Sequence, residues 1–460
     1  MRPWVLPGLL AAAAAGAAIG AVAYQPSASG PRASALTGPP TPVLSPRRLP
    51  AALSALSAAD HLAARLDPIV GAACMDVQVS GQTIYAHRPQ TALLPASNVK
   101  LLVAEAALTR LGPDSRFTTS AVVAKPAVNG VVDGPLWLVG GGDPLLITAG
   151  FRATQPEFTW STEPGSRLED LADRIKAAGV RSISGGIVGD DTRYDAQRAL
   201  PTWKSSYLAD GEIGAVGALV VNGGFQSPTH HVPAASPAQA AAAALTTLLE
   251  QRGVAVAAPA ISGAAPASRV TVASLDSLPL QQIVRVMLLE SDNLAAEMLV
   301  KELGHRFGTG GTWASGLAVL RATLAQAGLP VGGLALVDGS GLDRSDRATC
   351  DLLIDAIDAP GPVASLVRSD LPLAGRTGTL VHRMLGQPPV GRLRAKTGSL
   401  AGVAALTGLL TAPSGQPGPV FALLANDVGS DAAGVALEDR IAAALVTYPE
   451  APGPDSFAPS

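Results

Sequence analysis

The sequence is poor in cysteine, in aromatic residues and in excess charge of either sign. Its 460 residues include two cysteines, and aromatic residues make up only 4%. Two cysteines are too few for a disulfide-framed miniprotein or a four-cysteine zinc site. The formal net charge of −3 argues against nucleic-acid binding, which needs a basic excess or stripe. With 48% hydrophobic and 15% charged residues, a chain that is disordered throughout is excluded.

Motifs of histidine-based and metal-based catalysis are missing as well. The sequence contains no Gly-x-Ser-x-Gly elbow and no His-Glu-x-x-His pair, and His230-His231 has no carboxylate at ligand spacing. No motif in the sequence therefore supports a Ser-His-Asp triad or a metal site. We expect neither a metal nor an organic cofactor.

The N-terminal segment indicates export. An apolar run from Val5 to Ala23 follows Arg2 and ends in small residues that resemble a cleavage site. Residues 1–24 are either a cleaved signal peptide or a membrane anchor, because the run has a length between the two. Residues 25–50 are rich in Pro, Ala and Ser and are expected to form a linker. Both alternatives place the rest of the chain outside the cytoplasm, in the periplasm or cell-wall space.

Export gives a possible role to the two cysteines. Cys74 and Cys350 could form a disulfide in an oxidising compartment. The alternative is a pair of buried free thiols that pack as small hydrophobic residues. The sequence leaves both possibilities open.

Segments from both ends of the chain are predicted to build one α+β domain. Apolar spacing, turn residues and helix breakers predict helices over 51–66, 97–111, 168–178, 281–290, 293–305 and 437–448, and strands over 71–79, 82–87, 392–396, 403–411 and 420–426. Residues 51–112 and 276–448 would then form a sheet covered by helices. We expect residues 113–275 to be an inserted region of one or more modules, and residues 449–460 to be a flexible tail.

A serine and a lysine three residues apart form the first of three motifs. Ser97 begins a predicted helix, where Lys100 lies on the same face and free N–H groups favour negative charge. Burial would lower the pKa of Lys100, so that its amine could serve as the base for a serine nucleophile. The alternative is an N-capping serine beside a solvated lysine. Among six lysines, only Lys100 has Ser or Thr three positions earlier.

Two further motifs also occur once each. Ser291-Asp292-Asn293 is the only Ser-x-Asn in the sequence and falls between two predicted helices. Lys396-Thr397-Gly398 is the only Lys-Thr-Gly and continues into Ser399 at the end of a predicted strand. The same trio, in this order, marks β-lactamases and penicillin-binding proteins.

On these motifs the sequence resembles the class C low-molecular-mass penicillin-binding proteins, which are D-alanyl-D-alanine carboxypeptidase/endopeptidases of the penicillin-binding protein 4 type. Ser97 and Ser291 are 194 positions apart, which fits this branch rather than a compact β-lactamase. The resemblance implies a serine β-lactamase/DD-peptidase-like transpeptidase domain, an antiparallel sheet flanked by helices, with a large insertion between the first and second motifs. It implies peptidoglycan stem peptides as substrates and β-lactams as covalent inhibitors.

The same resemblance implies a role for each motif residue. Ser97 would attack the penultimate peptide carbonyl and Lys100 would take its proton. Ser291 would relay a proton to the leaving amine, and Asn293 would hold Lys100 and the substrate amide. The positive potential of Lys396 would attract the terminal carboxylate.

The other members of the third motif would bind substrate. Thr397 and Ser399 would receive the terminal carboxylate, and Gly398 would leave room for substrate beside the strand. We also consider Asp143 and Arg344 as the acid and base that recognise a diaminopimelate side chain. Their alternative roles are a turn cap for Asp143 and a solvated surface cation for Arg344.

Two other functions share part of this pattern. A β-lactamase or esterase on the same scaffold would carry all three motifs, and rapid turnover of penicillin would distinguish it. A non-catalytic cell-wall-binding protein would be expected to have lost part of the Ser97, Lys100 and Lys396 chemistry, and all three residues are present.

Overall fold

The computed structural model describes residues 50–154, 165–226, 232–412 and 417–450. The predicted signal or anchor, nearly all of the linker and most of the predicted tail lie outside these residues. Across the described ranges, none of the helices combines the length and apolar character that crossing a membrane requires.

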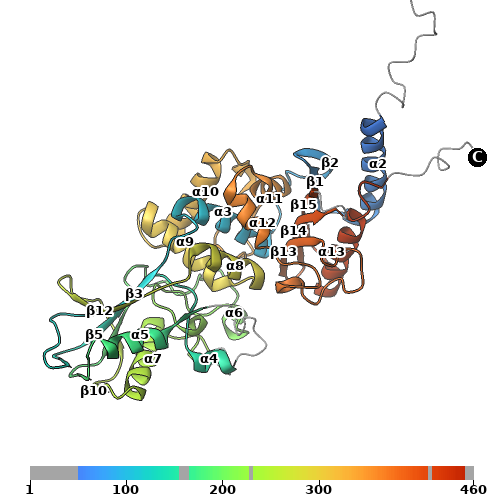
Figure 1. The fold of residues 1–460 in the computed structure, drawn as a ribbon. Coiled ribbons are helices and arrows are strands. Elements are labelled where there is room, and N and C mark those ends of the chain that lie inside the picture. Colours follow the sequence, from blue (N-terminus) through green and yellow to red (C-terminus); the bar gives the residue numbers. More distant parts are fainter. Residues whose placement is uncertain (1–49, 155–164, 227–231, 413–416, 451–460) are drawn as a thin grey trace, which may run out of the picture. The chain divides into compact units, whose positions relative to one another are not determined.

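Strands from both ends of the chain form one antiparallel sheet in the order β13-β14-β15-β1-β2. These strands are β1 (Cys74–Val79), β2 (Gln82–His87), β13 (Leu393–Leu400), β14 (Val403–Thr411) and β15 (Pro417–Asn426). Figure 1 shows the blue and red strands side by side, and Met75 pairs with Leu423. The strand predicted over 392–396 continues to Leu400, so it includes the whole Lys-Thr-Gly-Ser segment.

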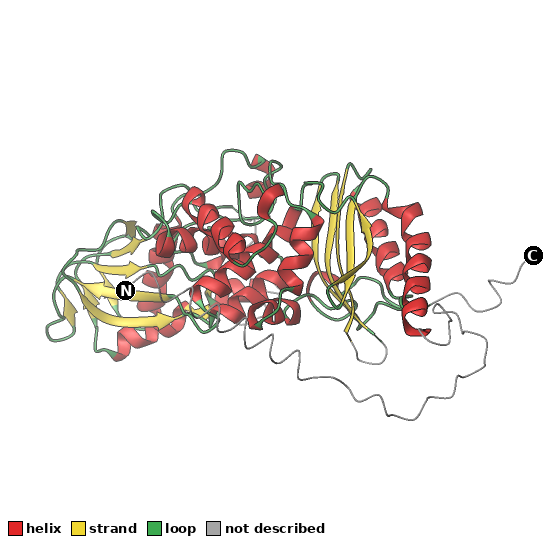
Figure 2. Cartoon of the chain, turned by 90° about the horizontal axis from the view of Figure 1, so that it is seen from above, coloured by secondary structure: helices red, strands yellow, loops and turns green. Residues whose placement is uncertain are grey.

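Alternating side chains of this sheet contribute to two cores. In β15, Val420, Ala422 and Leu424 belong to the core shared with the helical cluster. Their neighbours Phe421, Leu423 and Ala425 pack with α2 (Pro50–Val70) and α13 (Asp431–Leu445). Successive residues of a strand point to opposite faces, so an almost wholly apolar strand is buried on both sides. Figure 2 shows the sheet between its two layers of helices.

The helical cluster on the other face is built around α3 (Val99–Leu111), in which every residue from Val99 to Leu108 is buried. An apolar helix without a polar face is stable only when it is surrounded by protein. The remaining helices of this part are α8 (Leu280–Glu290), α9 (Asn293–Phe307), α10 (Trp313–Gln326), α11 (Cys350–Asp358) and α12 (Pro362–Ser369).

The segment from β3 to β12 has a core of its own. A second sheet has the order β11-β9-β5-β3-β12, and its apolar residues pack with α5 and α7. The elements are β3 (Thr118–Val123), β4 (Val131–Val132), β5 (Leu136–Val139), β6 (Leu146–Ile147), α4 (Ala149–Thr154), β7 (Ser166–Arg167), α5 (Leu168–Ala177), β8 (Ser182–Ile183), β9 (Ile187–Asp190), α6 (Ser205–Ala209), α7 (Pro237–Gln251), β10 (Ala255–Val256), β11 (Ile261–Ser262) and β12 (Val270–Asp276). Tyr194, Trp203 and Ile213 instead join the helical core, so part of the insertion packs directly on the helices. The assignment of residues 113–275 as an inserted region remains a prediction.

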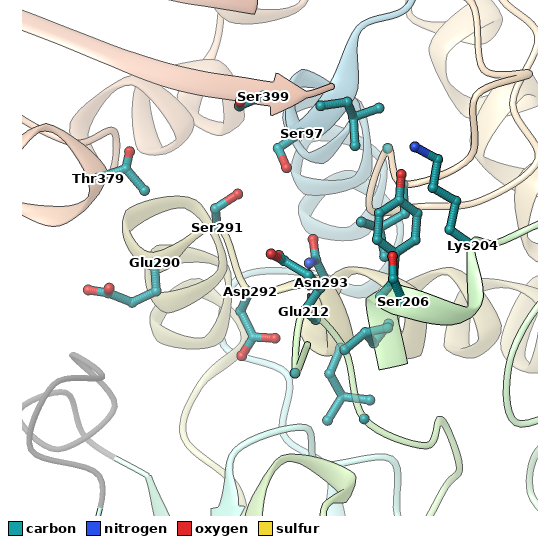
Figure 3. Close-up of a pocket in the computed structure, with 18 of the residues that line it drawn as sticks. Ser97, Lys204, Ser206, Glu212, Glu290, Ser291, Asp292, Asn293, Thr379 and Ser399 are labelled. Carbon is teal, nitrogen blue, oxygen red and sulfur yellow. Dashed lines mark hydrogen bonds between the residues drawn. The ribbon is translucent and has the colours of Figure 1, made fainter. Parts of the chain in front are cut away.

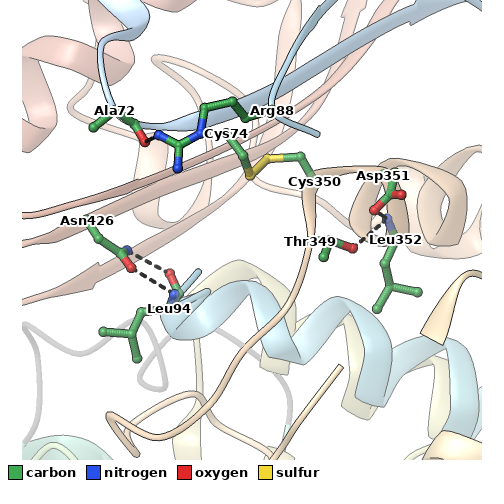
Figure 4. The surroundings of a disulfide bond; sticks show 9 residues. All are labelled: Ala72, Cys74, Arg88, Leu94, Thr349, Cys350, Asp351, Leu352 and Asn426. Carbon is green, nitrogen blue, oxygen red and sulfur yellow. Dashed lines mark hydrogen bonds between the residues drawn. A yellow bond between two sulfur atoms is a disulfide. The ribbon is translucent and has the colours of Figure 1, made fainter. Parts of the chain in front are cut away.

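A disulfide joins the sheet to the helical cluster. Cys74 in β1 and Cys350 at the start of α11 are bonded, with their Cα atoms 6.1 Å apart and both side chains fully buried. Figure 4 shows the bond crossing between the two elements. Of the two possibilities that the sequence left open, the structure therefore contains the disulfide rather than two free thiols.

Candidate active site

Ser97 lies where the chain turns into the buried helix α3. A short 3-10 turn, Ala96–Asn98, precedes the helix, and Ala96 adopts a φ of 45°, which is uncommon for a residue with a side chain. This turn leaves Ser97 partly exposed while Lys100, one turn further on, is fully buried. Nζ of Lys100 donates a hydrogen bond to Oγ of Ser97 at 2.9 Å, so the predicted pairing of these two side chains is present.

Three oxygen atoms hold the amine of Lys100. Besides Ser97, Nζ donates to Oδ1 of Asn293 and to the backbone carbonyl of Ser340, each at 2.7 Å. Burial lowers the pKa of Lys100 to about 8, and the carboxylates of Glu297 and Asp338 limit the fall. A lysine of this kind holds a useful fraction of neutral amine near neutral pH, as a general base requires.

The second motif occupies the break between two helices. Ser291 ends α8 in a left-handed conformation with a φ of 58°, a backbone strain that is common at functional sites. Asp292 caps α9 by accepting a hydrogen bond from Ala295 N, and Asn293 is the first helical residue. Ser291 and Asn293 line the same cavity as Ser97 (Figure 3). The amide of Asn293 donates to the carbonyl of Glu212 at 2.7 Å, so the insertion holds the side chain that contacts Lys100.

The third motif connects the sheet to the second motif. Nζ of Lys396 donates to Oγ of Ser291 at 2.9 Å and to the carbonyl of Thr397 at 2.8 Å. Burial and the charge of Lys100 lower the pKa of Lys396 well below its ordinary range. Thr397 and Ser399 line the cavity, as the alternation along β13 requires.

Gly398 has a packing role that the sequence did not indicate. A Cβ atom at this position would lie 2.9 Å from the carbonyl oxygen of Pro95, and Gly398 does not line the cavity. The missing side chain therefore lets β13 approach the turn that carries Ser97, and the room for substrate expected at this position stays a prediction.

A cavity of about 630 Å³ lies above these three motifs. The motif residues that line it are Ser97, Ser291, Asp292, Asn293, Thr397 and Ser399, whereas Lys100 and Lys396 are buried beneath its surface. Further lining residues that sequence reasoning missed are Lys204, Ser206, Tyr207, Glu212, Phe225 and Thr379. All but Thr379 come from the stretch 204–225, which contains no motif, so only the three-dimensional structure reveals them. Figure 3 labels Lys204, Ser206, Glu212 and Thr379 around the cavity.

The structure does not bring Asp143 and Arg344 into the cavity lining. Asp143 is only 3% exposed and accepts a hydrogen bond from Leu145 N at 3.0 Å, so its carboxylate caps the turn and does not project from it. Burial raises its pKa to about 6. Arg344 is exposed and donates to the carbonyl of Ala401 at 2.9 Å. Ala401 lines the cavity, so Arg344 lies next to the cavity rim.

Comparison with known proteins gives consistent results for family and fold. A family model described as the D-Ala-D-Ala carboxypeptidase 3 (S13) family matches residues 57–235 and 219–448. The D-alanyl-D-alanine carboxypeptidase of Actinomadura sp. (strain R39) is 30% identical, with 83% of each chain covered. Carboxypeptidase DacB of Mycolicibacterium smegmatis is 31% identical, over 76% of this chain and 75% of that protein. Penicillin binding protein 4 (dacB) from Haemophilus influenzae has the same fold, with a TM-score of 0.69 at 20% identity, over 84% of this chain and 97% of that structure.

The family match defines a peptidase, and the structural match confirms the predicted α+β catalytic fold. More narrowly, the chain belongs to the D-Ala-D-Ala carboxypeptidase 3 (S13) family. The resemblance drawn from the three motifs is thereby confirmed.

Proposed function

We propose that this chain hydrolyses the D-Ala-D-Ala bond of peptidoglycan stem peptides through an acyl-enzyme on Ser97. The observation that carries the proposal is the amine of buried Lys100, 2.9 Å from Oγ of Ser97. Neutral Lys100 takes the hydroxyl proton as Ser97 attacks the carbonyl of the penultimate residue. The terminal D-alanine leaves as its amine, and water then hydrolyses the ester.

The other two motifs serve the proton transfers and the developing charge. Ser291, which contacts Lys396, passes a proton to the leaving amine, and Asn293 holds Lys100 in place. Backbone N–H groups of Ser97 and Ser399 stabilise the oxyanion, a contribution of about 3–4 kcal/mol per donor in other enzymes.

The terminal carboxylate of the substrate is bound at the end of β13. Thr397 and Ser399 face the cavity there, and Oγ1 of Thr379 lies 2.8 Å from Oγ1 of Thr397. Two adjacent hydroxyls can both donate to one carboxylate. An arriving anion also raises the proton affinity of Lys396, so the positive charge that attracts the carboxylate is strengthened by the substrate itself.

The substrate requires an enzyme that works outside the cytoplasm. Peptidoglycan lies in the periplasm or cell-wall space, and the disulfide between Cys74 and Cys350 is typical of an oxidising compartment. We propose that residues 5–23 direct export, as a signal peptide or as a membrane anchor. We further propose that residues 113–275 form an inserted region whose segment around Tyr207 and Glu212 limits access to the cavity.

Covalent labelling with benzylpenicillin tests the catalytic assignment. Intact-mass analysis should show the addition of one penicillin, peptide mapping should place it on Ser97, and the adduct should persist for minutes or longer. Ser97→Ala should abolish labelling. Ser206→Ala is a matched control, because Ser206 lines the same cavity without a lysine contact among the described hydrogen bonds.

Each contrary result has a defined meaning. An adduct on another residue would reject Ser97 as the nucleophile. Rapid release of the hydrolysed drug would favour a β-lactamase over a peptidase. Release of free D-alanine measures carboxypeptidase activity, and cleavage of cross-linked dimers measures endopeptidase activity. Both assays on the same preparation give the balance of the two activities.

A further inference from the structure

The loop 338–341 packs directly against the backbone of the turn that carries Ser97. Gly341 has a φ of +84°, and a side chain at this position would collide with the carbonyl oxygen of Ala96. The close approach brings the carbonyl of Ser340 to the amine of Lys100, at 2.7 Å. A small displacement of this loop would therefore move one of the three oxygens that hold Lys100.

Glu297 is the side chain that fixes this loop from the helix behind it. Its Oε1 accepts hydrogen bonds from the N–H groups of Ser340, at 2.7 Å, and Gly339, at 3.1 Å. Its Oε2 accepts from Gly339 N at 3.0 Å and from Nε1 of Trp313 at 2.6 Å. The carboxylate is fully buried, and burial together with the charge of Asp338 raises its pKa to about 7. Its contacts are all with N–H donors, which favour the ionised form and limit this rise.

The position of Glu297 on its helix links it to the second motif. Glu297 is four residues after Asn293, so both lie on one face of α9. Asn293 holds Lys100 through its Oδ1, and Glu297 holds Lys100 through the backbone of Ser340. One helix therefore fixes two of the three hydrogen-bond acceptors of Lys100.

Charged groups face Lys100 from every element packed around it. The carboxylates are Glu297 and Asp292 on α9 and its cap, Asp338 in the loop and Glu212 in the insertion, and each raises the pKa of Lys100 against the effect of burial. Glu297 has the largest effect of these four. The amine of Lys396 lies on the sheet side and interacts with Lys100 as a like charge.

We propose that Glu297 is a positioning residue for the acylation step: it holds the Ser340 carbonyl against Lys100, and its negative charge acts on the Lys100 amine. The inference rests on the proposed function, because it assumes that Lys100 is the base for Ser97. It adds a residue that lies outside the three motifs and touches neither Ser97 nor the cavity. In the ionised state, Glu297 favours protonated Lys100, so it raises the lowest pH at which the free amine is available.

The pH dependence of penicillin acylation separates this role from a merely structural one. Acylation rates of the full chain would be measured by quenching and mass spectrometry from roughly pH 5.5 to pH 9.5, a range that covers deprotonation of Lys100. In Glu297→Gln, loss of the negative charge lowers the pKa of Lys100, so the acid limb should move down by about one pH unit. The plateau rate should fall about tenfold or more, since the new amide group faces the N–H donors.

Two other variants complete the test. Glu297→Asp retains the charge but shortens the side chain, so the plateau should fall while the acid limb stays in place. Glu105→Gln makes the same chemical change at another buried glutamate, on the helix of Lys100 but away from the loop, and should match the wild type in both respects.

The possible results decide between the assignments. A wild-type profile in Glu297→Gln, or a lowered plateau with an unmoved acid limb, would overturn the proposal. If Glu297→Gln does not fold, Glu297→Asp decides, and a wild-type plateau in that variant would refute the positioning role. Absence of an adduct on Ser97 in the wild type would instead reject the proposed function, so the two failures are distinguishable.

Discussion

Removing the disulfide by replacing Cys74 and Cys350 together with alanine should destabilise the folded chain without altering its site chemistry. The bond closes a loop with a sequence separation of 276. In the chain-entropy treatment, a loop of this length constrains the unfolded state by about 5–6 kcal/mol at 25 °C. Residual structure in the unfolded chain reduces the effect, so we expect a loss of about 3–5 kcal/mol. In a chain this long, that is a fall of about 3–8 °C in the unfolding temperature.

The measurement compares urea unfolding and thermal unfolding of wild type and double variant, each with and without reductant. Reductant should lower the stability of the wild type to that of the variant and leave the variant unchanged. The penicillin acylation rate at 25 °C should differ little between the two, because neither cysteine lines the cavity. Equal unfolding midpoints for wild type and variant, or two titratable thiols in the untreated protein, would refute the reasoning.

Three further predictions concern single side chains. Lys100→Ala should preserve the circular dichroism spectrum but reduce penicillin acylation at least about a hundredfold, whereas an undiminished rate would mean that another group takes the proton from Ser97. Glu302→Gln breaks an ion pair whose carboxylate is fully buried and should cost about 1.5–3 kcal/mol in urea unfolding. Asp173→Asn makes the same change at an exposed carboxylate of another ion pair and should change the free energy of unfolding little. Equal losses of stability in the two variants would contradict the expected effect of burial. Arg344→Ala should lower kcat/KM more for diaminopimelate-containing peptides than for a simple acylated D-Ala-D-Ala, and equal losses on both would assign Arg344 to structure.

The sequence predicted the parts of the site whose geometry is local. A helix places a residue and its third neighbour on one face, so the contact of Ser97 with Lys100 follows once the helix is recognised. Alternation along a strand likewise places Thr397 and Ser399 on the cavity side. The strands of the main sheet were predictable for the same reason, because their apolar residues alternate or run continuously between turns.

The parts that sequence reasoning missed depend on contacts between distant segments. The backbone carbonyl of Glu212 holds Asn293. Every residue has such a carbonyl, so the amino-acid type does not indicate this contact. Glu297 could have been noticed as an acid in an otherwise apolar stretch of helix, but its partners lie in another loop. The position of Asp143 after three glycines suggested a projecting carboxylate, whereas the turn folds inward and uses it as a cap. The approach of Gly398 to the carbonyl of Pro95 was equally hidden, because it joins two segments that lie far apart in the sequence.

The strand order of the main sheet determines when this enzyme can become active. β1, from the first part of the chain, lies next to β15 from the last, and Lys396 comes from a strand on the far side of β15. A ribosome makes the N-terminal segments first, so a growing chain carries Ser97 and Lys100 long before it carries their partners. Cys74 must also wait for Cys350, and with two cysteines in the sequence it has no other partner within the chain. The three motifs can therefore come together only after the strands near the C-terminal end have been made.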